Sequence, residues 1–140
     1  MANPKRVLFL CTANSARSQM AEGLMKSLGS GKWDVRSGGT FSSFVHPLAI
    51  RVMEEIGIDI SQHKSKSMNP FLNEVFDYII TLCDEAADSC PAFPGGGKRI
   101  HWPLEDPAAA LGSMEERLAV FRRIRGEIKR KIDEFLESAD

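Results

Sequence analysis

The chain has 140 residues, of which 43% are hydrophobic and 26% charged, the balance of a globular domain with one hydrophobic core. Its formal net charge of −1 gives no general attraction to nucleic acid or to anionic membranes. The longest apolar runs span only a few residues, far short of the ~20 that cross a bilayer, and no signal peptide is evident. We therefore expect a single cytoplasmic domain over residues 1–140, with no nucleic-acid or membrane partner.

Three cysteines, Cys11, Cys83 and Cys90, occur in the chain. Three is an odd number and too few for a disulfide scaffold, which favours a reducing compartment. In a chain of this kind the thiols are either buried packing residues or chemical groups.

The first half of the chain alternates between strand and helix patterns. Residues 6–10 are an apolar run typical of a strand buried on both faces. Apolar residues at helical spacing predict a helix over 18–28 that stops near a glycine. Residues 33–37 alternate and then reach the Gly38-Gly39 pair, which predicts a second strand followed by a turn.

The second half continues this alternation. A proline in the first turn favours a helix over residues 47–56, and continuous apolar runs predict strands within 76–82 and at 100–102. Ser113 and Glu116 have the spacing of a capping box. A long final helix follows them, with apolar residues every three or four positions.

Apolar strands separated by helices predict an α/β fold, with a four-stranded parallel sheet flanked by helices on both faces. In such sheets ligands bind beyond the carboxyl ends of the strands. Cys11 and Cys83 follow the first and third predicted strands, and Asp106 follows the fourth. We therefore expect these three residues to converge on one edge of the sheet.

The segment from Cys11 to Ser18 predicts an oxyanion site. A loop between a strand end and a helix N-terminus directs backbone N–H groups inward, and the helix dipole adds positive potential. The Arg17 fork suits two oxygens of a tetrahedral anion, and the same field favours a Cys11 thiolate. The predicted oxyanion-binding residues are Thr12, Ala13, Asn14, Ser15, Ala16, Arg17 and Ser18. The alternative is that Cys11 is a buried cysteine at a strand end.

The run CTANSARSQMAEG, residues 11–23, resembles the signature of the thioredoxin-coupled arsenate reductases, which share the fold of the low-molecular-weight protein tyrosine phosphatases. The resemblance covers nearly the whole chain. It continues at residues 57–61, 81–83, 90–91, 101–102 and 106–107. It implies the parallel four-stranded sheet that the periodicity also predicts.

The resemblance implies a relay of three cysteines that reduces arsenate, with phosphate or sulfate as binding analogues. Cys11 forms a covalent adduct with arsenate, held by Arg17 and the loop, while Asp106 donates a proton. Cys83 then attacks Cys11 and releases arsenite, and Cys90 attacks Cys83, leaving a disulfide for thioredoxin to reduce. The relay needs no cofactor and no metal, and we expect a monomer.

The residues between Cys83 and Cys90 are compatible with a helix. Seven residues at about 1.5 Å each would separate the two Cα atoms by roughly 10 Å, beyond the reach of a disulfide. Forming that bond would therefore require unwinding, for which the glycines at 95–97 are suited. A zinc site is the disfavoured alternative, because no histidines cluster with the pair.

Asp106 precedes Pro107 and is either a helix-capping residue or a general acid; the resemblance favours the acid. Ala108, Ala109 and Ala110 follow it and offer no aromatic ring to a phosphotyrosine. The alternative function is a small phosphatase acting on phosphate monoesters, and a non-enzymatic alternative is an oxyanion-sensing or redox-sensing module.

The chain departs from the family pattern at Ala13 and Ala16, where many members have glycine and cysteine. Some of these reductases bind potassium through Asn, Glu, Ser and Asp side chains. Asn14, Glu22 and Ser37 match three of those positions, whereas Lys66 stands at or near the fourth. A lysine ammonium there would replace the cation, so we expect no dependence on potassium. The three histidines, His46, His63 and His101, are expected in packing or surface roles.

Overall fold

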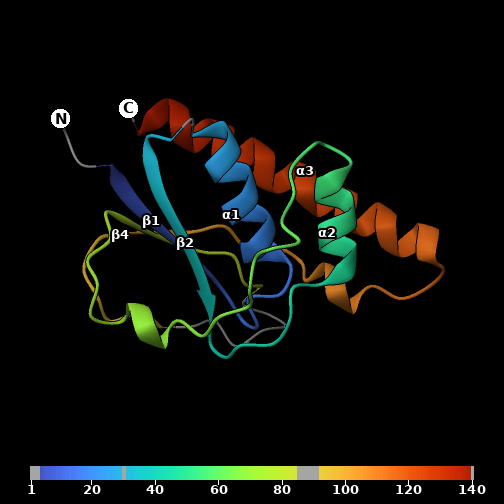
Figure 1. Cartoon of the computed structure of the whole chain (residues 1–140), viewed down its shortest axis with the longest axis horizontal. Coiled ribbons are helices and arrows are strands. Elements are labelled where there is room, and N and C mark those ends of the chain that lie inside the picture. Colours follow the sequence, from blue (N-terminus) through green and yellow to red (C-terminus); the bar gives the residue numbers. More distant parts are fainter. Residues whose placement is uncertain (1–3, 30, 85–91, 140) are drawn as a thin grey trace.

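The computed structural model describes residues 4–29, 31–84 and 92–139 of the chain. Its centre is a four-stranded sheet in the order β2-β1-β3-β4, with every neighbouring pair parallel (Figure 1). The predicted parallel α/β fold is confirmed. The strands are β1 (Lys5–Cys11), β2 (Trp33–Gly39), β3 (Tyr78–Thr81) and β4 (Lys98–His101).

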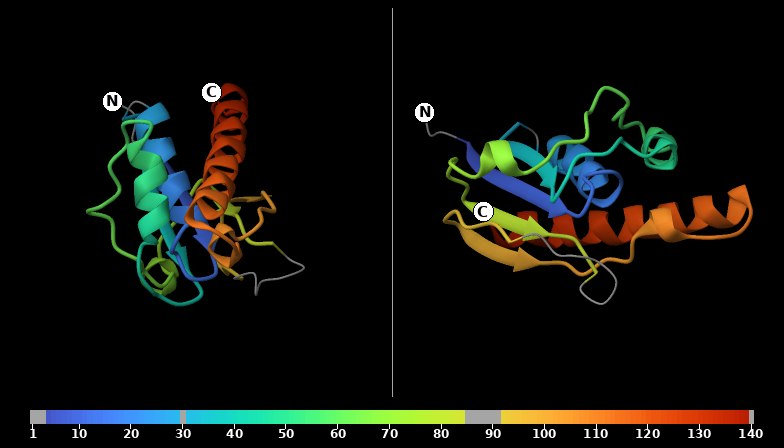
Figure 2. Two further views of the ribbon diagram at one scale, coloured as in Figure 1. Left: turned by 90° about the vertical axis from the view of Figure 1, so that its right-hand side faces the viewer. Right: turned by 90° about the horizontal axis from the view of Figure 1, so that it is seen from below.

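The two faces of the sheet are covered differently. The helices α1 (Arg17–Leu28), α2 (Pro47–Glu54) and α3 (Met114–Ser138) pack on one face and contact one another. The long α3 runs along the molecule beside α1 (Figure 2). In the described part of the chain the other face is covered by loops and by the short 3-10 helix η1 (Asn69–Phe71), so of the helices predicted on both faces the long ones lie on one face only. Its core consists of Leu8, Leu10, Phe71, Phe76, Ile79 and Phe93.

The final helix begins at the predicted capping box. The Ser113 hydroxyl accepts a hydrogen bond from the Glu116 backbone N–H, and the Glu116 carboxylate accepts one from the Ser113 N–H, each at 3.1 Å. These two bonds satisfy orphan donors of the first helical turn. The face predicted from spacing is buried except at its first member, Met114, which is 47% exposed. The buried members are Leu118, Phe121, Ile124, Ile128, Ile132 and Phe135.

Gly38 and Gly39 extend β2 instead of forming the predicted turn. The reason is close packing: a Cβ at Gly38 would lie 3.0 Å from the Met68 Cα. The Gly39 N–H donates to the Lys66 carbonyl, and the Met68 N–H donates to the Gly39 carbonyl. These glycines therefore allow a neighbouring segment to approach the end of β2.

The carboxyl ends of the strands share one edge of the sheet, where β1 ends at Cys11 and Cys83 follows β3 by two residues. Asp106 follows β4 and precedes the 3-10 helix η2 (Pro107–Ala109). The helix predicted between the second and third cysteines lies outside the described residues. None of the helices in the described part of the chain is long and apolar enough to cross a membrane.

Candidate active site

The loop between β1 and α1 is built around Asn14, whose φ of 48° is the only positive value at a non-glycine position in the described chain. Asparagine tolerates this left-handed conformation better than most residues. Ala13 does not adopt it. The alanine methyl group is therefore compatible with the loop, because the strained position is the next one along.

The N-terminus of α1 is open to an anion. Its N-cap residue, Ala16, makes no side-chain capping bond, and the first helical turn contains no acidic residue. The first N–H groups of such a helix have no intrahelical partner, and the dipole there favours negative charge. The local chain thus leaves donors for an oxyanion beside Cys11.

Cys11 is a free thiol at the base of this loop, only 2% exposed. Its Sγ lies 2.8 Å from the Ser18 Oγ. The Ser18 oxygen also accepts a 2.7 Å hydrogen bond from the Asn14 side-chain amide. Because that oxygen accepts from Asn14, the Ser18 hydroxyl hydrogen is free to point at the sulfur, where it stabilises a thiolate.

A buried chain of hydrogen bonds extends from this pair. The Asn14 Oδ1 accepts from the Gln19 side-chain amide and from the Lys66 backbone N–H, each at 2.8 Å. The Gln19 Oε1 in turn lies 3.0 Å from the His63 Nδ1. The sequence did not predict Gln19 and His63 as site residues. Helical spacing shows only that Gln19 belongs to α1, and His63 was expected in a packing or surface role.

The outer side of the loop is held by the neighbouring segments. The Ser65 hydroxyl donates to the Ala13 carbonyl at 2.8 Å, and the Phe41 N–H donates to the Thr12 carbonyl at 3.3 Å. A Cβ at Gly39 would lie 2.7 Å from the Thr12 carbonyl oxygen. The loop backbone is therefore fixed on several sides before any ligand binds.

Arg17 joins three segments that are far apart in the sequence. Its buried guanidinium donates to the carbonyls of Leu82 at 3.4 Å and Leu104 at 3.2 Å. Its Nη2 lies 3.8 Å from the Asp106 Oδ2. Leu82 directly precedes Cys83, and Leu104 lies two residues before Asp106. Arg17 therefore contacts the segments that carry Cys83 and Asp106.

Asp106 caps a short helix and also faces Arg17. Its carboxylate caps η2 by accepting a 3.0 Å hydrogen bond from the Ala108 N–H. The same side chain faces Arg17 and is 35% exposed. A carboxyl group so placed has solvent access and a fixed direction, both of which a general acid requires.

Cys83 is fully buried and disulfide-bonded, whereas Cys11 is a free thiol. Cys11 is therefore not the partner of Cys83. Cys90, the third predicted catalytic cysteine, lies outside the described residues.

A pocket of about 470 Å³ opens above Cys11. Residues of the loop, Arg17, Asp106 and Ala108 line it. Aromatic side chains line the pocket as well, although the alanines after Asp106 predict none. They are Phe41, Phe44 and His46, from the connection between β2 and α2.

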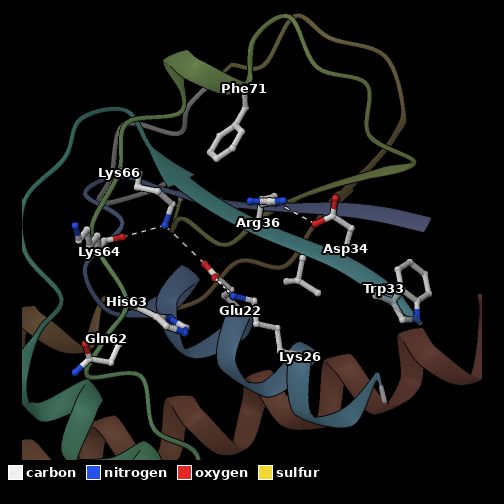
Figure 3. A pocket seen from close by; sticks show the side chains of 11 residues that line it. Glu22, Lys26, Trp33, Asp34, Arg36, Gln62, His63, Lys64, Lys66 and Phe71 are labelled. Atoms are coloured by element: carbon white, nitrogen blue, oxygen red, sulfur yellow. Dashed lines mark hydrogen bonds and ion pairs between the residues drawn. The ribbon is translucent and has the colours of Figure 1, made fainter. Parts of the chain in front are cut away.

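Glu22 lies at the centre of a second group of polar residues (Figure 3). Its carboxylate accepts hydrogen bonds from Ser37 and from Lys26, and the Lys66 ammonium lies 3.9 Å away. Burial by itself would raise the pKa of Glu22. The hydrogen bonds from Lys26 and Ser37 and the charge of Lys66 outweigh burial, so the Glu22 pKa lies below its ordinary value.

Lys66 stands where its ammonium faces this buried carboxylate, and burial lowers its own pKa. Figure 3 shows the side chain reaching between Glu22 and the Lys64 carbonyl, to which it donates at 2.9 Å. Within the described ranges, no group of three or more His, Cys, Asp or Glu side chains is placed to hold a metal ion.

Known proteins resemble this chain in sequence and in structure. The family model of the low molecular weight phosphotyrosine protein phosphatases matches residues 6–140. An arsenate reductase of Halalkalibacterium halodurans is 48% identical over 136 residues, which cover 97% of this chain and 98% of that protein.

Two solved structures are also similar. An arsenate reductase in the phosphate binding state has a TM-score of 0.82 at 40% identity, covering 97% of this chain and 99% of that one. A thioredoxin-dependent arsenate reductase of Corynebacterium glutamicum has a TM-score of 0.73 at 30% identity, covering 99% of this chain and 63% of that one. The chain therefore belongs to the low molecular weight phosphotyrosine protein phosphatase family, and it resembles arsenate reductases of that fold over almost its whole length.

Proposed function

We propose that the chain reduces arsenate to arsenite, with Cys11 as the nucleophile. The observation that carries the proposal is the free Cys11 thiol at the base of the loop between β1 and α1, with the Ser18 Oγ 2.8 Å from its sulfur. The name of the 48% identical relative supports arsenate as the oxyanion.

In the first step the Cys11 thiolate attacks arsenic and forms a sulfur–arsenic bond. The hydroxyl group of protonated arsenate accepts a proton from Asp106, its bond to arsenic breaks, and it leaves as water. Arg17 and the loop N–H groups hold the remaining oxygens. Arsenic stays pentavalent in this step, so no electrons are yet transferred.

In the second step the Cys83 thiolate attacks the Cys11 sulfur. The sulfur–arsenic bond breaks, its electron pair reduces arsenic to the trivalent state, and arsenite leaves. The hydrogen bond from Arg17 to the Leu82 carbonyl supports this step, because it holds the segment that carries Cys83 against the oxyanion site.

In the third step the Cys90 thiolate attacks the Cys83 sulfur and frees Cys11. A disulfide-bonded Cys83 beside a free Cys11 is the distribution expected at the end of this sequence. Thioredoxin then supplies two electrons through its own dithiol, as the description of the Corynebacterium glutamicum relative suggests. All electrons pass through thiols, so the proposed cycle uses no cofactor. We propose that it operates in the cytoplasm in a monomer.

The relay is tested by arsenate turnover with thioredoxin, thioredoxin reductase and NADPH. Cys11→Ser, Cys83→Ser and Cys90→Ser should each abolish steady-state turnover. Cys83→Ser should still form the arsenic adduct, whereas Cys90→Ser should release one arsenite per chain and stop as a Cys11–Cys83 disulfide. Normal turnover in both Cys83→Ser and Cys90→Ser would rule the relay out.

The role of Asp106 is separated from its capping role by Asp106→Asn. An asparagine retains an oxygen that can accept from the Ala108 N–H, so the fold around η2 should remain. It cannot donate a carboxyl proton, so turnover should fall by about 10² to 10⁴. An unchanged turnover number would show that the carboxylate only caps the helix.

A second candidate is a phosphatase acting on phosphate monoesters, which Phe41 and Phe44 favour because they line the pocket beside Cys11. Aryl phosphate hydrolysis needs Cys11 but neither other cysteine. It should therefore survive in Cys83→Ser and Cys90→Ser if this function is the true one. If the unmodified chain neither reduces arsenate nor hydrolyses aryl phosphates, the remaining alternative is a non-enzymatic oxyanion-sensing or redox-sensing module.

A further inference from the structure

His46 occupies a specific place beside the pocket above Cys11. It is the N-cap residue of α2, it is half-buried, and its ring lines that pocket. Its backbone N–H donates to the Ser15 carbonyl at 3.0 Å, which ties it to the oxyanion loop. The ring packs on Phe121, with centroids 4.8 Å apart. Its position is therefore set by the helix, the loop and the core.

The hydrogen bonds of His46 determine which ring nitrogen carries the proton. Its Nδ1 accepts a 3.1 Å hydrogen bond from the Leu48 backbone N–H. A nitrogen that accepts carries no hydrogen, so the neutral ring has its hydrogen on Nε2. Burial and, to a smaller extent, Arg117 lower the pKa of His46, while Asp106 opposes them. At neutral pH the ring is thus uncharged and offers one N–H donor.

No described residue accepts a hydrogen bond from this donor. Among the described residues, the hydrogen bonds of His46 are those of its backbone and of Nδ1, with ring contacts to Phe44 and Phe121. No fully buried side-chain nitrogen or oxygen in the described part of the chain lacks a partner. The Nε2–H is therefore accessible, and the ring that carries it lines the pocket above Cys11.

We propose that His46 is a further substrate-binding residue, whose Nε2–H donates to the outward oxygen of the oxyanion bound above Cys11. The inference rests on the proposed function. Cys11, the loop, Arg17, His46 and Asp106 all line this one pocket. In the proposal the loop N–H groups and Arg17 hold the oxygens nearest the Cys11 sulfur, and His46 takes the oxygen farthest from it. The outward oxygen is the one that leaves when sulfur attacks from the opposite side.

A neutral donor suits this position. An imidazolium beside Asp106 would stabilise the carboxylate and oppose its protonation, which the proposed acid needs. The neutral ring instead orients the leaving oxygen without holding the Asp106 proton. His46 and Asp106 would then divide the task, with one side chain positioning the oxygen and the other protonating it.

Two variants separate binding from structure. His46→Asn keeps a side-chain oxygen that can cap α2, but its short amide does not reproduce the Nε2–H. His46→Phe keeps a ring against Phe121 and loses both the cap and the donor. Both should lower kcat/KM for arsenate by about tenfold or more, while only His46→Phe lowers the melting temperature. Wild-type kcat/KM in His46→Asn would overturn the proposal.

A spectroscopic test does not depend on turnover. Nitrogen-15 NMR of the histidines should show the Nε2–H form of His46, and adding inorganic phosphate should shift its Nε2 resonance. An Nδ1–H form, or an Nε2 signal that stays fixed while the amides of residues 12–17 respond, would overturn the proposal. If the unmodified chain does not reduce arsenate, the proposed function fails, yet the phosphate titration still decides the role of His46.

Discussion

The Sγ of Cys11 and the Oγ of Ser18 lie 2.8 Å apart across the two ends of the oxyanion loop. They are seven positions apart in the chain, and the left-handed Asn14 between them lets the backbone turn back. Asn14 also orients Ser18 through its side-chain amide. Asn14 therefore both shapes the loop and holds the Ser18 oxygen beside the Cys11 sulfur.

Ser18→Ala should slow alkylation of Cys11 by iodoacetamide at neutral pH by about tenfold, because a hydrogen bond to the charged sulfur is lost. The rate is measured by mass spectrometry of the peptide that contains Cys11. Ser27→Ala is the matched control, since Ser27 is an exposed residue of the same helix. Equal rates in the unmodified chain and in Ser18→Ala would refute this role of the hydroxyl.

Gly39→Ala should displace the oxyanion loop. The new Cβ would meet backbone atoms at 2.7 Å from the Thr12 oxygen and 2.8 Å from the Asn14 nitrogen, and backbone cannot move aside cheaply. A shift of this size in a catalytic loop can cost about 10² in rate, so kcat/KM should fall steeply. Phosphate affinity, measured by calorimetry, should fall with it.

Gly126→Ala is the control for that substitution. Gly126 lies inside α3 with nothing within 4 Å of its Cβ position, so alanine should stabilise the helix by about 0.5–1 kcal/mol. A chemical denaturation curve measures the change. If Gly39→Ala and Gly126→Ala change activity and stability alike, close backbone packing at Gly39 does not position the loop.

Turnover should not depend on potassium. The Lys66 ammonium lies 3.9 Å from Glu22 and already places a positive charge beside that buried carboxylate. Steady-state rates in potassium and sodium salts of equal ionic strength should agree. Lys66→Ala should lower the melting temperature, because the buried Glu22 charge loses a compensating partner. Strong activation of the unmodified chain by potassium would contradict the prediction.

Stability should fall on mild acidification. His46 and His63 both have pKa values below the ordinary 6.5, mainly because each is buried, so the folded chain binds protons less readily than the unfolded chain. Their contribution is complete above pH 6.5 and is lost as the pH falls through their folded pKa values. The urea midpoint should therefore be lower at about pH 5.5 than at about pH 7.5.

The control for this pH effect is the double variant His46→Asn, His63→Asn. Carboxylates such as Glu22, with a pKa below its ordinary 4.5, stay charged throughout that range. The imidazoles are thus the groups expected to respond, and the double variant should show a flatter pH dependence. An unchanged urea midpoint in the unmodified chain would disprove the assignment.

Local patterns in the sequence predict much of this fold. The apolar run before Cys11, the helical spacing after Ser18 and the Ser113 capping box each involve neighbouring residues, so periodicity and backbone hydrogen bonding reveal them. The strand assigned to residues 33–37 was too short, because the glycines after it meet a distant segment that spacing does not show.

By itself, the sequence determined the parallel α/β fold and the loop from Cys11 to Ser18, because a strand, a turn and a helix N-terminus in succession place their donors through short-range geometry. Only the tertiary structure decided which distant side chains meet that loop. Arg17 donates to the Leu82 carbonyl, 65 positions along the chain, and His46 lines the same pocket as Cys11. Contacts of that kind depend on how helices pack on the sheet, which no local pattern of residues specifies.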